Sequence, residues 1–276
     1  MEGKPTLSQT VRADFKIGLK VPFLLAVFGV FSGFCFDNWE ALRSFIRSSK
    51  QYSESSVQCV MYYFFNSFSY GGVFSTYFAT IMAAIPFAAN YCQETEGGMS
   101  IYKITRCGSS VYVRSNFLVA AMLGGLTLFL GGLIFSALLG IYLPIVTPGK
   151  LFESQWIPFF QALNTGNGVL YMVIVLYISF LGGCHWASVG LCASAYFPSK
   201  YVAVCAPFIF RFVLTQIGRL LKLPNGLRLE LLLCARGTIY SDSVTLIVTT
   251  ATVLLLIFVC YRLFTRRIER SIWNVE

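Results

Sequence analysis

Six apolar runs of membrane-spanning length are the feature that most limits what this chain can fold into. A helix crosses a bilayer core with about 20 apolar residues, and its backbone polar groups must be satisfied internally because lipid offers no partners. Repeated runs of this length therefore predict an all-α polytopic membrane protein with six transmembrane helices. The runs cover residues 20–36, 71–93, 116–143, 168–197, 201–218 and 243–264.

The composition agrees with a chain that is mostly embedded in a membrane. Of its 276 residues, 56% are hydrophobic and 12% are charged, against about a quarter charged in ordinary soluble domains. No segment of the size of a soluble domain remains outside the runs, so we expect one membrane domain over residues 1–276. Residues 1–19 carry charges and lack a small-residue cleavage site after the next run, so we expect them to be retained.

The net charge of +9 does not indicate a nucleic-acid partner, because the basic residues lie at the ends of the apolar runs, as the positive-inside rule expects. Six spans place both termini on one side, which we take to be the cytoplasmic side of the cell membrane. The opposite side receives fewer basic residues. Those assigned to the cytoplasm are Lys4, Arg12, Lys16, Lys20, Lys103, Arg106, Arg114, Lys200, Arg262, Arg266, Arg267 and Arg270.

Two polar segments beside the runs are expected to lie along the membrane surface. In residues 1–19, Leu7, Val11 and Phe15 recur every four positions with charged residues between them, which predicts an amphipathic helix that leads into the first span. Residues 222–240 are apolar but interrupted by charges, so we expect an interfacial segment on the outer face that does not cross.

The sequence lacks the residue patterns of a metal site or of common catalytic centres. His185 is the single histidine and no acids cluster, so neither a multi-histidine site nor a magnesium site is indicated. The nine cysteines contain no C-x-x-C pair, and no phosphate-binding loop occurs. We expect no cofactor held by this chain and no enzymatic activity of its own, and we expect His185 to be a packed or interhelical hydrogen-bonding group.

Small residues and one mid-span base predict close helix contacts. Gly29 and Gly33 form a G-x-x-x-G face in the first span, and Gly124, Gly125, Gly131 and Gly132 repeat in the third. General bundle packing and dimerisation explain these faces equally well. Arg211 is the only base near mid-span, where a charge is costly; it pairs with a partner helix, lines a passage, or reaches an interface if the fifth span is misplaced.

The loop over residues 93–115, QETEGGMSIYKITRCGSSVYVRS, is unusually polar for its place between two apolar runs. It begins with the acids Glu94 and Glu96, continues with Gly97 and Gly98, and enters the third span after a turn at residues 107–110. The spacing predicts a short amphipathic helix from about Met99 to Thr105. A helix of this kind can fill a groove on a soluble partner.

Residues 86–125, PFAANYCQETEGGMSIYKITRCGSSVYVRSNFLVAAMLGG, carry a resemblance. An apolar helix followed by E-x-E-G, a hydrophobic-Tyr pair, T-R and a Gly/Ser turn resembles the permease subunits of type-2 ATP-binding-cassette transporters. In that family this loop carries a coupling helix that docks on the ATPase subunit. Chain length, an amphipathic N-terminal helix, six spans and a basic tail fit the same layout. The paired Gly97 and Gly98 and the Cys107 after T-R depart from the pattern and leave the register of the coupling helix open.

The resemblance implies a role for nine residues. Glu94, Glu96 and Gly97 would shape the contact with the ATPase subunit, and Tyr102, Thr105 and Arg106 would lie at it. Gly29, Gly33 and Arg211 would face a second permease chain, which would be the same chain or a relative.

The implied function is that of a membrane subunit of an ATP-driven exporter of a hydrophobic or amphipathic substrate, with ATP and Mg²⁺ bound by the ATPase. One alternative is a stand-alone secondary transporter or channel, favoured only by Arg211 and Pro207. The other is a lipid-modifying membrane enzyme, which would need clustered acids or histidines that the sequence does not offer.

Overall fold

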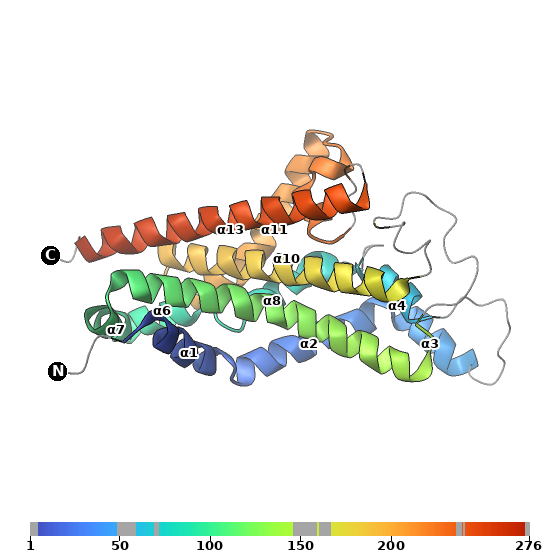
Figure 1. Ribbon diagram of the computed structural model, residues 1–276, viewed down its shortest axis with the longest axis horizontal. Helices are drawn as coiled ribbons and strands as arrows, with labels where there is room; N and C mark the ends of the chain where they lie inside the picture. Colours follow the sequence, from blue (N-terminus) through green and yellow to red (C-terminus); the bar gives the residue numbers. More distant parts are fainter. Residues whose placement is uncertain are drawn as a thin grey trace.

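The computed structural model describes residues 5–48, 59–68, 72–145, 159, 167–235, 239 and 241–273, and this part of the chain is helical without strands (Figure 1). Four helices are long and apolar enough to cross a membrane. They are α8 (Ser109–Tyr142), α10 (Gly168–Tyr196), α11 (Lys200–Leu220) and α13 (Asp242–Trp273). The prediction of an all-α chain is confirmed for the described residues, and several of their helices are long and apolar enough to span a membrane. Of the segments predicted above, residues 1–4, 71, 236–238 and 240 lie outside the described residues.

Two further helices make a bent pair that passes the same test when taken together. Helix α1 (Leu7–Gly18) and helix α2 (Val21–Asp37) meet at an angle of 61°. The break follows from local chemistry: Lys20 is extended at the start of α2, and Pro22 lies in its first turn, where a missing N–H costs nothing. Helix α1 begins with a capping box, in which Thr6 and Gln9 each satisfy the other's backbone N–H.

The second predicted span, residues 71–93, is not one continuous helix. It consists of a π-helical turn η1 (Phe74–Phe78), helix α5 (Ala79–Ala84), a turn and helix α6 (Asn90–Glu96). Pro86 lies in the turn, where it removes a backbone donor and crowds the carbonyl four residues earlier. The Asp37 carboxylate caps the start of η1 by accepting from the N–H groups of Phe74 and Ser75 at 2.9 and 3.1 Å. The described residues thus give four candidate spans, or five with the bent pair.

Helices α8 and α10 form the centre of the bundle, and their closest approach depends on glycine. A Cβ on Gly124 would overlap the Ala187 side chain, and one on Gly183 would overlap the Gly124 backbone. The same glycine-rich side of α8 receives α2, since a Cβ on Gly131 would overlap Val30. Close contacts through these glycines, as the sequence predicts, are confirmed. By contrast, only 17% of the most apolar window of α13 is buried, against 61% for α8 and α10.

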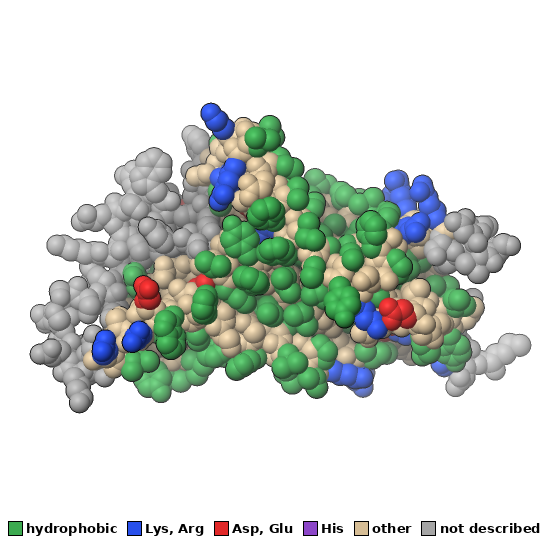
Figure 2. Space-filling model, turned by 180° about the vertical axis from the view of Figure 1, so that it is seen from behind, with side chains coloured by type: hydrophobic (Ala, Val, Ile, Leu, Met, Phe, Trp, Pro, Cys, Tyr) green, Lys and Arg blue, Asp and Glu red, His purple; other side chains and the backbone are tan. Residues whose placement is uncertain are grey.

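The helices that carry the candidate site at residues 93–115 lie together at one end of the bundle. Helices α1, α6, α7 (Met99–Cys107) and the C-terminal part of α13 lie at one end, and α3 (Trp39–Ser48) and α4 (Val60–Phe68) lie at the other (Figure 1). Residues after α11 form a small projection with η2 (Asn225–Leu227) and α12 (Leu229–Leu232). Figure 2 shows hydrophobic side chains across the middle of one face, with most basic side chains toward its margins.

Candidate functional site

The loop between α6 and α8 folds into a separate short helix, α7, held between two glycine turns. Gly98 has φ +68° and Gly108 has φ +86°, a backbone region that side chains with a Cβ rarely adopt. Gly97 ends α6, and its N–H donates to the Gln93 carbonyl at 3.0 Å. The structure therefore fixes the register of this loop: α7 runs from Met99 to Cys107, which includes the helix predicted from Met99 to Thr105.

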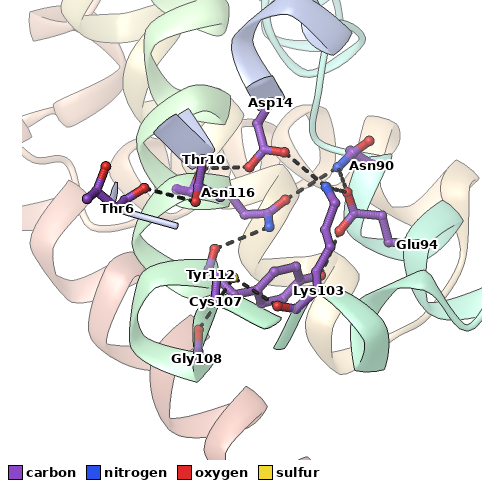
Figure 3. Close-up of polar contacts among 11 residues, drawn as sticks. Thr6, Thr10, Asp14, Asn90, Glu94, Lys103, Cys107, Gly108, Tyr112 and Asn116 are labelled. Carbon is purple, nitrogen blue, oxygen red and sulfur yellow. Dashed lines mark hydrogen bonds and ion pairs between the residues drawn. The ribbon is translucent and has the colours of Figure 1, made fainter. Parts of the chain in front are cut away.

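A buried group of polar side chains, the polar anchor, ties α7 to the bundle (Figure 3). The ammonium of Lys103 lies 2.6 Å from Glu94 Oε1 and 2.9 Å from Asp14 Oδ1. The hydroxyl of Tyr112 donates to Glu94 Oε2 at 2.8 Å, and that of Ser115 donates to Asp14 Oδ2 at 2.6 Å. We define the polar anchor as these five residues, which come from α1, α6, α7 and α8.

The polar anchor buries two carboxylates without leaving any of their oxygens unpaired. Asp14 is 2% exposed and Glu94 is 8% exposed, and all four carboxylate oxygens accept a hydrogen bond. Burial opposes the charge of Lys103, but its hydrogen bonds to Glu94 and Asp14 outweigh that effect and raise the pKa of Lys103 above its ordinary value. The lysine is therefore a cation held in place between two carboxylates.

The opposite side of α7 is exposed in the part of the chain that the structure describes. Met99, Ile101 and Tyr102 are 52%, 62% and 60% exposed, and Thr105 and Arg106 are exposed beside them. Toward the bundle, Ser100 and Cys107 are buried. The helix thus offers an apolar and aromatic surface with one base, while its inner side is fixed by the polar anchor.

Glu96 extends this site toward α11. Its carboxylate lies 2.8 Å from the ammonium of Lys200, the first residue of that helix, and both side chains are about half exposed. A pair at this exposure adds little to stability. It places the end of α6 next to the start of α11.

Sequence reasoning misses most of the polar anchor. The resemblance assigns Glu94 to the contact surface, yet this residue is buried and its carboxylate binds Lys103 and Tyr112. The sequence pattern places Asp14 on a polar face, although it lies three residues after Val11 and four before Gly18, on the packed side of α1. That spacing is the one signal available. The pairing with Lys103 spans 89 residues and leaves no local pattern.

The residues expected at an interface with a second permease chain face this chain instead. A Cβ on Gly29 would lie 2.8 Å from the Met82 sulfur, and one on Gly33 would overlap the Phe74 ring. The G-x-x-x-G face of α2 is therefore covered by η1 and α5. Of the two explanations left open for this face, packing within the bundle is the one that the structure shows.

Arg211 also lies inside, at 3% exposure. Its guanidinium donates to the Ser75 carbonyl at 3.2 Å and to the Cys234 sulfur at 2.7 Å, and it lies 5.8 Å from the centre of the Trp186 ring. It neither reaches a surface nor faces a free side of α11. Its role in this chain is to join α11 to the π-helical turn η1 and to the segment after α12.

His185 and the cysteines give no sign of metal chemistry in the described part of the chain. His185 is 1% exposed, and neither ring nitrogen has a hydrogen-bond partner among the described residues. No group of three or more His, Cys, Asp or Glu side chains that could hold a metal occurs among these residues. His185 is therefore a packed side chain of α10 beside Trp186.

Comparison of the chain with models of protein families, with curated proteins and with solved structures finds no match. Its function is therefore inferred from the geometry of α7 and from the motif in residues 86–125.

Proposed function

We propose that this chain is the membrane subunit of an ATP-driven transporter, and that α7 is the element through which a separate ATPase subunit acts on it. The observation that carries the proposal is the two-sided character of α7. Its outer side exposes Ile101 and Tyr102, while on its inner side Lys103 binds carboxylates of α1 and α6. Those carboxylates in turn accept hydrogen bonds from Tyr112 and Ser115 of α8. A partner that pushes on α7 would therefore move α1, α6 and α8 with it.

The polar anchor suits the transmission of force because it is a buried ion-pair network with defined partners. Separating Lys103 from either carboxylate would leave an unpaired charge inside the protein, which is expensive. Movement of α7 as a rigid unit with the bundle is cheaper than movement of α7 alone. In this mechanism α8, whose first turns carry Tyr112 and Ser115, changes its tilt when the partner closes.

The same proposal assigns the chemistry to the partner. The ATPase subunit would bind ATP and Mg²⁺, and this chain would convert its cycle into changed access across the membrane, a coupling between two states and not a reaction step. A second permease chain completes the proposed assembly, with a hydrophobic or amphipathic substrate exported between the two. Because Gly29, Gly33 and Arg211 are used within the chain, the contact with that second chain falls on other residues.

The proposal is tested by coexpressing the chain with a candidate ATP-binding-cassette ATPase, sought first in the adjacent reading frames, and measuring how much ATPase is retained during purification. The sequence offers a matched pair of variants: Ile101 and Tyr102 are exposed on α7, and Ile141 and Tyr142 are exposed at the far end of α8 at 70% and 71%. We expect I101A/Y102A to weaken ATPase binding by about tenfold or more, the typical loss at an interface hot spot, and I141A/Y142A to leave it unchanged.

Three results would contradict the proposal. The first is equal ATPase retention by both double variants, and the second is ATP hydrolysis by the chain purified alone. The third is substrate movement driven by an ion gradient without any ATPase, which would favour the secondary transporter or channel.

A further inference from the structure

The outward face of α1 carries two basic side chains, and a third follows at the break before α2. Arg12, Lys16 and Lys20 are all exposed. Arg12 and Lys16 lie about one turn apart on α1, on the side opposite Asp14 and Gly18, which are buried. Lys20 lies beyond α1, as the extended residue at the start of α2. The helix therefore turns its one acid inward and its bases outward.

The charge of this stripe is not neutralised within the described part of the chain. None of the three bases takes part in an ion pair there, whereas Asp14 is already bound to Lys103 and Ser115. We define the basic stripe as Arg12, Lys16 and Lys20. It presents a charge of +3 to which no acid of the described residues is paired.

Apolar side chains next to the basic stripe indicate what kind of partner this is. Ile17 and Leu19 are 42% and 44% exposed, and Val21, Leu24 and Leu25 at the start of α2 are each more than 60% exposed. These residues continue directly into a candidate membrane span. A soluble acidic protein on the stripe would leave this apolar surface in water, whereas a bilayer covers it with acyl chains and places headgroups beside the bases.

We propose that the basic stripe binds the headgroups of anionic phospholipids, in the leaflet at the α7 end of the bundle. The 61° bend between α1 and α2 allows α1 to lie across the membrane surface while α2 enters the bilayer. Arg12, Lys16 and Lys20 then contact lipid phosphates, and Leu24 and Leu25 contact the chains. This site does not depend on an ATPase partner, so its test is independent of the test of the proposed function.

The test uses the purified full chain in a neutral detergent, titrated with phosphatidylglycerol or phosphatidylcholine, with the thermal unfolding midpoint as the measurement. We expect phosphatidylglycerol to raise the midpoint more than phosphatidylcholine does, and the difference to shrink at high salt because exposed charges are screened. In R12Q/K16Q/K20Q the apparent affinity for phosphatidylglycerol should fall roughly fivefold for each base removed. R12K/K16R/K20R should keep it.

A matched control removes the same charge elsewhere. R43Q/R47Q/K222Q changes three exposed bases outside the basic stripe, two on α3 and one just after α11, and should retain the affinity measured at the basic stripe. Equal losses in the two triple variants would overturn the proposal, because the effect would then follow net charge. Stabilisation of the wild-type chain by inorganic phosphate to the same extent would show a free-phosphate site and would also overturn it.

Two further measurements keep the proposal testable. If the triple variant does not fold, K16Q alone should show a partial loss with an unchanged phosphatidylcholine response, and an unchanged phosphatidylglycerol response would count against the site. If phosphatidylglycerol acts equally on wild type and R12Q/K16Q/K20Q while the variant loses its ATPase partner, the stripe binds protein and the lipid proposal is wrong.

Discussion

Lys103 is the side chain on which the position of α7 depends, because it pairs with two buried carboxylates at once. Replacing it by methionine keeps most of the apolar stem but leaves Asp14 and Glu94 without their cation. Breaking a buried pair in this way costs about 3–5 kcal/mol. Because the Lys103 side chain is 23% exposed, we expect the free energy of unfolding to fall by about 2–3 kcal/mol. Chemical unfolding should show this loss for Lys103→Met. Lys222→Met serves as the control, because this lysine is exposed and lies outside the ion pairs of the described residues. It should change stability by less than about 0.5 kcal/mol.

The raised pKa of Lys103 also predicts the pH range over which the polar anchor holds. A base whose folded pKa lies above its unfolded value adds stability that is complete below the ordinary lysine pKa of 10.5 and is lost as pH rises through the folded value. Hydrogen exchange of residues 99–107, corrected for intrinsic rates, should therefore show steady protection from about pH 6 to about pH 9. A loss of protection in wild type within that range, absent from Lys103→Met, would show that Lys103 loses its proton below its ordinary pKa. That result would contradict the assignment of Lys103 as a cation held between two carboxylates.

At the scale of single residues, sequence pattern finds exposed groups better than buried polar ones. The resemblance implies that Tyr102 and Arg106 lie at a partner contact, and both are exposed. It assigns Glu94 to the same region, and the spacing in residues 1–19 counts Asp14 among the charges between the apolar positions. Both acids are nevertheless buried, because their partner Lys103 lies on another helix. A buried charge is specified by its partner, and one sequence does not show which distant residue that is.

At the scale of elements, the two glycine turns decide where α7 starts and stops. A Cβ on Gly98 would meet open space among the described residues, but the backbone φ there is +68°, so replacement costs backbone strain and not a clash. Gly98→Ala should destabilise the chain by about 1 kcal/mol, and Gly98→Asn should cost less, since asparagine tolerates this conformation. Gly140→Ala, in the helical interior of α8 and also with open space, should instead be neutral or stabilising by about 0.5–1 kcal/mol. Equal effects of the two alanine variants on unfolding would show that the left-handed turn does not matter.

Helix existence follows from the sequence, whereas helix continuity does not. The apolar runs beyond residue 116 each appear in one helix, because length and hydropathy decide that outcome. The run over residues 71–93 is interrupted, since Pro86 and the cap from Asp37 change its backbone without changing its hydropathy. A hydropathy pattern averages over about 19 positions, so it does not detect one proline or one capping carboxylate.

At the scale of the whole molecule, the interrupted segment over residues 72–96 determines how the chain returns from one end of the bundle to the other. Helix α2 leads to the end of the bundle that holds α3, and α6 and α7 lie at the other end, so residues 72–96 run the length of the bundle (Figure 1). The helix ends lie as an even number of passes would place them, since α1 and the C-terminal part of α13 lie at the same end. We therefore expect the interrupted segment to act as one pass in the path of the chain.

This path predicts which sites share a side of the membrane. Native Cys107 is a poor reporter, because it is 8% exposed and burial raises the pKa of its thiol, which lowers its reactivity. We therefore choose exposed positions for single cysteines in a chain without native ones: Ser44 at the α3 end, and Ser110 and Glu269 at the α7 end. In intact cells an impermeant maleimide should label S44C, whereas S110C and E269C should react only after permeabilisation. Labelling of S110C and E269C from opposite sides would mean an odd number of crossings between them, and the segment-by-segment path would then be wrong. Labelling of both from outside, with S44C protected, would keep the path and reverse its orientation, which would remove α7 from the reach of any cytoplasmic ATPase.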